Sequence, residues 1–240
     1  MIQIQALSSL KEICEQITKL RQLFPAICGA DKCLMSLIDS GCVSLPNDAR
    51  KWIAIPNWLS CQEEFGETYP EAVVSVLTKL QEVNPGNMRI ELTDDWASKC
   101  QLYRTKATEV AWNTICSQQH NHDIIIMAVQ IGKRHKGKNV KVIRELIEWP
   151  EYGLGAFEIG IMILQCPSLL SIVDGGGINC VGDEYDTCWG HDGRKHVPCF
   201  SLERERMVFG ANYYVGPSSQ RSCASGFILK TARKNMAMVG

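Results

Sequence analysis

The feature that most constrains the fold is an almost unbroken apolar run, GAFEIGIMILQ, at residues 155–165. A helix needs about 20 apolar residues to cross a bilayer, so this run is too short to be a membrane span. A surface helix would carry polar residues along one face, and here they are missing from most positions. We therefore expect a helix that is buried on most sides and that other parts of the chain must cover.

Helix caps predict four more helices in the first two-thirds of the chain. A side-chain oxygen that accepts a hydrogen bond from the first free amides favours a helix start, and a glutamate three residues later strengthens it. Such starts are found at Ser9, Asp31, Thr68 and Asn139, with the corresponding helices ending before Pro25, Gly41, Asn84 and Pro150.

The most regular periodicity lies between residues 96 and 114. Steps of four and three alternate there through Trp96, Cys100, Tyr103, Ala107, Val110 and Thr114, supported by Ala111 and Ile115. This spacing predicts one helix with that stripe facing the core. The next run, IIIMAVQI at residues 124–131, fits a buried strand or a buried helix, and Asp123 before it and Gly132 after it favour the helix.

After residue 171 the composition changes to short β-favouring runs separated by glycines. The fold class indicated is α+β, in which a helix-rich N-terminal two-thirds packs against a small antiparallel β-sheet formed by the C-terminal third. We expect residues 1–168 to be the helical region and residues 171–230 the antiparallel β region, sharing one core with it. Residues 231–240 are expected to form a flexible tail.

A cysteine and histidine cluster in this last third has the residue types that bind zinc. Cys188, His191, His196 and Cys199 form two pairs, and zinc takes four thiolate or imidazole ligands in a tetrahedron. Only four residues separate the pairs, whereas zinc loops between ligand pairs usually hold about a dozen or more. The spacing therefore favours the alternative, a glycine-rich turn with ordinary cysteines and surface histidines, over a bound zinc ion.

The same segment holds the candidates for catalysis. Asp183 and Glu184 can act as an acid and base pair, and His191 or His196 can activate a thiol as a nucleophile. These groups support a metal- or thiol-dependent hydrolase with its site in residues 174–199. The competing interpretation is a set of solvated turn residues, because no local signature singles out one cysteine.

The strongest local concentration of positive charge is the run KRHKGK at residues 133–138. Its cations are Lys133, Arg134, Lys136 and Lys138, with Lys141 and Arg144 on the following helix. This 133–144 basic patch can contact a phosphate group or nucleic acid. The patch has neither the glycine spacing of a P-loop nor interleaved aromatic residues. These absences favour the alternative, a solvated loop between two helices.

Net charge and the N-terminus limit the partners and the compartment. The formal net charge is −1, so no global field would draw nucleic acid or an anionic membrane to the chain. Lys11 and Glu12 stand where a secretory signal would be apolar. We therefore expect a cytoplasmic protein without a membrane partner, whose twelve cysteines are reduced.

The absence of a specific catalytic motif favours a binding or interaction protein. Its helical body would present a surface to another protein, and a zinc ion, if bound, would brace its C-terminal loops. The hydrolase is the alternative. The two classes differ in whether Asp183, Glu184, His191 and His196 converge in one pocket or point separately into solvent.

Overall fold

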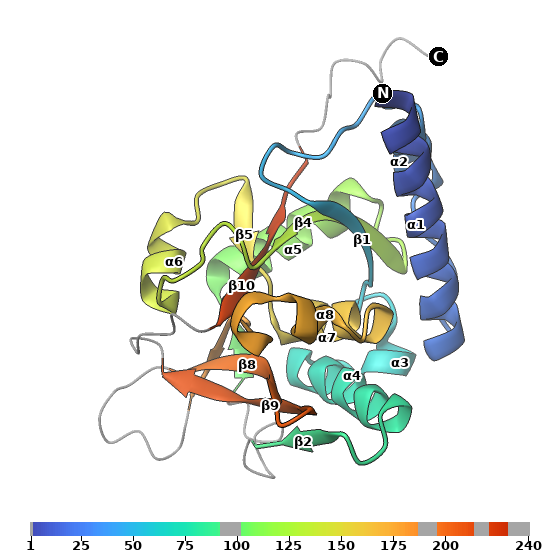
Figure 1. Ribbon diagram of the computed structural model, residues 1–240. Helices are drawn as coiled ribbons and strands as arrows, with labels where there is room; N and C mark the ends of the chain where they lie inside the picture. The colour runs from blue at the N-terminus through green and yellow to red at the C-terminus, as the bar shows by residue number, and fades with distance from the viewer. Residues whose placement is uncertain (1, 92–101, 187–195, 214–220, 230–240) are drawn as a thin grey trace.

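The computed structural model describes residues 2–91, 102–186, 196–213 and 221–229, and Figure 1 labels its helices and strands. In this part of the chain ten strands join one mixed sheet, whose main path is β1-β4-β10-β6-β8-β7-β3. Strand β5 also pairs with β10, β9 with β8, and β2 with β9. The strands are β1 (Lys51–Pro56), β2 (Met88–Ile90), β3 (Leu102–Arg104), β4 (Ile124–Ile131), β5 (Glu151–Gly153), β6 (Gly177–Asn179), β7 (Asp183–Tyr185), β8 (His196–Glu203), β9 (Arg206–Tyr213) and β10 (Ser222–Phe227).

This sheet corrects the expected fold class, because it is neither small nor confined to the C-terminal third. Strands β1 to β5 come from before residue 168, and β10 with β6 and β2 with β9 are parallel neighbours. Strands β1 and β4 are buried along almost their whole length. Such strands lack the alternation of apolar and polar residues that marks a half-exposed strand. The run at 124–131 is therefore a strand, although its flanking residues favour a helix.

Eight α-helices are described, α1 (Ile2–Leu23), α2 (Lys32–Asp39), α3 (Gln62–Phe65), α4 (Tyr69–Val83), α5 (Lys106–Gln118), α6 (Val140–Leu146), α7 (Ala156–Gln165) and α8 (Leu169–Ile172). The caps expected at Asp31, Thr68 and Asn139 are confirmed, since each side chain accepts a hydrogen bond from an amide of the following first turn. Helix α1, in contrast, begins at Ile2 and passes through Ser9.

Helix α5 is shorter than its periodicity predicts, and its buried side is rotated from the expected stripe, although Ala111 and Ile115 do face the core. Residues 102–104 form strand β3, and the helix begins after Thr105, whose side chain caps the first turn. Residues 92–101 lie outside the described part of the chain. Trp112 is on the buried side, while Val110 is 50% exposed. Burying a tryptophan removes more apolar surface from water than burying a valine, which favours the face that carries Trp112.

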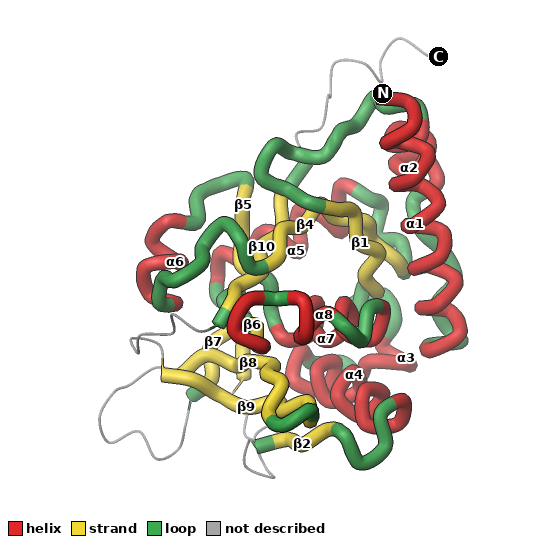
Figure 2. The backbone as a smooth tube through the Cα atoms, viewed as in Figure 1, coloured by secondary structure: helices red, strands yellow, loops and turns green. Residues whose placement is uncertain are grey.

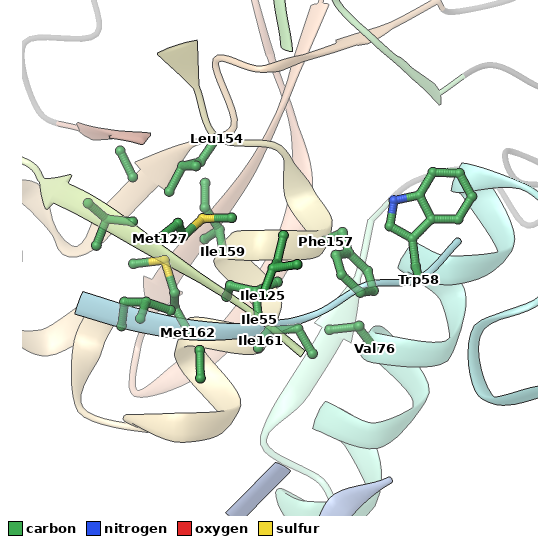
Figure 3. Close-up of a cluster of buried hydrophobic side chains, with 14 of the residues drawn as sticks. Ile55, Trp58, Val76, Ile125, Met127, Leu154, Phe157, Ile159, Ile161 and Met162 are labelled. Atoms are coloured by element: carbon green, nitrogen blue, oxygen red, sulfur yellow. The ribbon is translucent and has the colours of Figure 1, made fainter. Parts of the chain in front are cut away.

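Helix α7 is the expected buried helix and lies near the centre of the molecule (Figure 2). Every residue from 156 to 164 is buried. Helix α4 approaches it closely, since a Cβ added at Gly160 would lie 2.5 Å from Cγ1 of Val76. Figure 3 shows side chains of α7 gathered in one apolar cluster with Ile55 of β1 and Ile125 of β4. The sheet and α4 thus supply the cover that α7 requires.

The main apolar core draws on both sides of the boundary expected near residue 168, with members from Ile13 to Ile228. The division into residues 1–168 and 171–230 stays a prediction. The tail expected at residues 231–240 lies outside the described residues.

Two glutamines complete hydrogen bonds that the sheet leaves open. Where β10 no longer pairs with β4, the Ile126 amide donates to Gln119 Oε1 and the Ile126 carbonyl accepts from Gln119 Nε2, both at 2.8 Å. At β1, Gln16 accepts from the Ala54 amide and donates to the Trp52 carbonyl. Each side-chain amide takes the place of a neighbouring strand, which matters because buried backbone groups without partners are destabilising.

Replacing Gln119 with alanine should destabilise the protein strongly. Both backbone groups of Ile126 would stay buried without partners, so we expect the free energy of unfolding to fall by about 2–4 kcal/mol. Gln22→Ala, on the exposed side of α1, should change it by less than about 0.5 kcal/mol. Urea unfolding followed by circular dichroism measures both changes. A loss as small for Gln119→Ala as for Gln22→Ala would contradict the role assigned to Gln119.

Candidate functional site

The described residues include only two of the four that the sequence groups as a zinc site. Cys188 and His191 lie outside the described residues. His196 opens strand β8, and Cys199 lies further along the same strand with its side chain buried. Among the described residues, no three His, Cys, Asp or Glu side chains are arranged to hold a metal ion. The four-ligand site therefore stays a prediction.

Asp183 and Glu184, expected to act as an acid and base pair, point away from each other. Both lie in β7, and successive side chains of a strand alternate between its two faces. Asp183 is fully buried, whereas Glu184 pairs with Arg144 of α6, with 2.9 Å between Oε1 and Nη1. The two carboxyls therefore lie on different faces of β7, and their role as an acid and base pair stays a prediction.

The buried cysteines near β7 are poor nucleophiles. Burial raises the pKa of Cys199 to about 11, although Arg221 donates to its sulfur, and it raises the pKa of Cys223 to about 12. Burial also holds the pKa of Cys180 well above its ordinary value. The thiolate, rather than the thiol, attacks a substrate or binds a metal. These three side chains therefore stay protonated near neutral pH.

A polar cluster that no sequence motif indicates surrounds Asp183 at the N-terminus of α7. The Tyr69 hydroxyl and the Ala156 amide both donate to Asp183 Oδ2, at 2.7 and 2.6 Å. Beside them the fully buried Glu158 forms an ion pair with Arg104. The side chains come from α4, β3, α7 and β7, which are distant in the sequence. Only the folded chain brings them together.

Arg104 lies between two aromatic rings of this cluster. Its guanidinium carbon is 4.5 Å from the centre of the Tyr69 ring and 4.4 Å from that of Trp112. The faces of such rings attract cations, more strongly when water is excluded. Burial alone would lower the pKa of Arg104, but the charge of Glu158 raises it above its ordinary value. The arginine therefore stays charged in the interior.

The cluster is packed against the N-terminus of α7. Burial raises the pKa of Asp183 from 3.8 to about 7, and the positive charge of Arg104 limits that rise. Carboxyls perturbed in this way occur at active sites, but also in structural networks. A Cβ added at Gly155 would collide with Asp183 and Tyr69, so these two side chains pack directly against the N-terminus of α7. We assign the cluster to the framework of the fold.

Two hollows of the described surface lie on helix α1. One follows its outer face, and the other lies between α1 and α2 and is lined by Leu10, Cys14, Lys32, Met35, Ser36 and Asp39. Both are shallow and open, and neither includes a site residue expected from the sequence. Small-molecule sites are usually deeper concavities, so these hollows are poor candidates for a substrate pocket.

Helix α6 exposes apolar side chains on its outer side. Val142 and Leu146, one turn apart, are 36% and 46% exposed, and Trp149 just beyond the helix is 64% exposed. The other tryptophans in the described part of the chain are at most 8% exposed. This segment therefore differs from the rest of the described surface in presenting a tryptophan to water.

The inner side of α6 is anchored to the sheet. This side, which includes Ile143, packs with side chains of β8 and β10 in a small apolar cluster. The Arg144 guanidinium donates to the carbonyls of Val181 and Asp183 and pairs with Glu184. Packing and hydrogen bonds together fix the orientation of the helix, so its outer side has one defined arrangement.

The loop that leads into α6 is braced from inside by Glu151. Arg134 Nε lies 2.9 Å from Glu151 Oε2, and His135 Nε2 lies 2.9 Å from Oε1. Arg134 also pairs with Asp48. Burial alone would raise the pKa of Glu151, but the hydrogen bonds from His135 and Ser225, helped by the charge of Arg134, lower it below its ordinary value. The carboxylate thus stays charged and holds the loop.

This bracing divides the basic run into structural and surface residues. Arg134 already has two carboxylate partners within the fold. The side chains of Lys133, Lys136 and Lys138 are exposed. Contact of the 133–144 patch with phosphate or nucleic acid stays a prediction.

Comparison of the chain with protein-family models, with curated proteins and with solved structures finds no match. No described helix combines the length and the apolar character that crossing a membrane requires. What the protein does is therefore inferred from its own residues.

Asp183→Asn should change how stability depends on pH. Between pH 3.8 and about 7 the folded state keeps the Asp183 proton while the unfolded chain loses it. Protonated Asp183 thus makes its full contribution to stability below about pH 4, and this contribution is lost as the pH rises toward about 7. The free energy of unfolding falls by at most about 1.4 kcal/mol per pH unit in this window. The unfolding free energy of the wild type relative to Asp183→Asn should fall over this window. Urea titrations across it that gave a constant difference would refute the raised pKa.

Glu151→Gln should destabilise the protein, and Glu148→Gln should not. The first change removes the charge that holds Arg134 and His135, and because Arg134 is 37% exposed we expect a loss of about 2 kcal/mol rather than the larger cost of a fully buried pair. Glu148 is exposed, so its change should stay within about 0.5 kcal/mol. Chemical denaturation measures both, and equal effects would argue against the brace.

Proposed function

We propose that the protein is a binding protein that recognises another protein through the outer side of α6. We call this site the α6 surface and define it by its apolar side chains and the exposed lysines of the same segment, Val142, Leu146, Trp149, Lys133, Lys138 and Lys141. Figure 1 shows α6 at one side of the molecule, where a partner can reach it.

The exposure of Trp149 is the observation that carries this proposal. The ring of a tryptophan has a large apolar area, and leaving it in water forfeits the free energy of burying it. Tryptophan is also enriched among the residues that contribute most to protein–protein binding. Leu146 and Val142 extend the exposed apolar area along the preceding turns of α6.

The rigidity of the α6 surface also supports the proposal. The inner side of α6 is packed, Arg144 is bonded to β7, and Glu151 holds the preceding loop. A surface that is already ordered loses less conformational entropy when a partner binds. Binding free energy from its apolar side chains is therefore available for affinity.

A metal- or thiol-dependent hydrolase at residues 174–199 finds less support. Asp183 and Glu184 point to different parts of the molecule, and the thiols of Cys180 and Cys199 are buried and protonated.

Selection of peptides from a random display library on the immobilised full chain tests the proposed function. We expect selected peptides whose affinity falls by about 30-fold with Trp149→Ala, the effect of a residue that contributes about 2 kcal/mol. Ile172→Ala is the matched control, because Ile172 is 71% exposed and lies outside the α6 surface. It should leave the affinity unchanged.

Both substitutions alter exposed side chains, so both variants should melt like the wild type, which circular dichroism checks. Peptides that bind the wild type and Trp149→Ala equally well would overturn the proposed function. Failure to select any peptide would overturn it as well.

A further inference from the structure

We infer that the partner presents an acidic polypeptide segment to the α6 surface, with apolar side chains flanked by aspartate or glutamate. This inference rests on the proposed function, because it names the chemistry of the partner for the same surface. It follows from the charges that the fold leaves exposed in this segment.

The arginines of this region already have partners in the fold. Arg134 pairs with Asp48 and Glu151, and Arg144 pairs with Glu184. No ion pair with another described residue is formed by the exposed lysines Lys133, Lys138 and Lys141. Like charges at the edge of a binding surface attract anionic groups and reject cationic ones. The lysines therefore favour a partner segment with negative charge.

Two exposed carboxylates decide which class of anionic partner fits. Glu145 precedes Leu146 on α6, and Glu148 precedes Trp149. An anionic lipid surface or a nucleic acid presents a dense array of phosphates, which both carboxylates would repel. A polypeptide carries its charges singly, so acidic side chains can meet the lysines while neutral or basic ones meet the two glutamates. We therefore favour a polypeptide.

The apolar side chains favour the same class. Val142 and Leu146 stand one helical turn apart on one side of α6. Aliphatic side chains of this kind pack against apolar side chains of a partner, whereas bases stack on aromatic rings and would find only Trp149 here. Trp149 follows Leu146 by three positions, so its Cα is at most about 11 Å from that of Leu146. A short segment of the partner can cover all three.

Three probes separate these partners, namely peptides from the random library, vesicles of phosphatidylserine and phosphatidylcholine, and a single-stranded oligonucleotide. We expect the peptides that depend on Trp149 to be enriched in aspartate and glutamate and to bind more weakly as salt rises. Changing Lys133, Lys138 and Lys141 together to glutamine should weaken their binding by about 10-fold. The matched control changes Lys11, Lys32 and Lys106, which are exposed elsewhere, and should weaken it by less than about 2-fold.

The outcomes distinguish this inference from the proposed function. Peptides that depend on Trp149 but are neutral or basic, or that bind both lysine variants equally well, would overturn the acidic partner and leave the proposed function intact. Absence of any peptide that depends on Trp149 would overturn both. Vesicle or oligonucleotide binding that needs Trp149 and the three lysines, and is tighter than peptide binding, would replace the polypeptide with a lipid or a nucleic acid.

Discussion

The first backbone amides of a helix have no acceptor within the helix, and in a buried helix water cannot supply one. In α7 charged side chains accept these hydrogen bonds. At the N-terminus of α7, Asp183 accepts a hydrogen bond from the Ala156 amide and Glu158 accepts one from the Gly155 amide. A carboxylate at that depth needs a positive partner, which Arg104 supplies. Arg104 in turn lies between the rings of Tyr69 and Trp112. Elements α4, α5, α7, β3 and β7 are thereby tied to one point, which fixes how the sheet lies around α7.

Local sequence signals were sufficient for the helix starts at Asp31, Thr68 and Asn139 and for the buried helix α7, because caps and composition depend on neighbouring residues. Long-range features were not accessible in this way. Arg104 and Glu158 are 54 positions apart, and neither has a local pattern that marks it as half of a buried pair. The apolar run at 124–131 is equally compatible with a helix, and only pairing with β1 and β10 makes it a strand. In α5, Trp112 is buried and Val110 is half exposed, although Val110 belongs to the regular stripe. The tryptophan buries more apolar surface than the valine would.

Some features of the α6 surface are visible in the sequence and others appear only in the fold. The positive run at 133–138 is visible in the sequence, but the inward turn of Arg134 toward Glu151 is not, because the carboxylate lies on a later strand. The exposure of Trp149 is hidden for a different reason. Apolar residues at 140, 142, 143, 146 and 147 cover more than one face of α6, so the sequence alone leaves open which of them pack. In the structure, Val140, Ile143 and Ile147 pack in the small apolar cluster, and the other two face outward.

The attachment of α6 is largely separate from the main core, and this separation bears on its role. Its inner side packs with Val181, Val197 and Cys223 in a cluster distinct from the one around α7. Arg144, on the inner side, links α6 to the carbonyl of Asp183, whereas Val142 and Leu146 on the outer side are exposed and belong to neither apolar cluster. Substitutions at sites without shared partners act almost independently on stability, so the outer side of α6 can change with little effect on the buried charges at the N-terminus of α7. A catalytic centre requires the opposite arrangement, in which the framework itself fixes the reacting groups. The exposed outer side of α6 thus supports the proposed recognition surface rather than a catalytic centre.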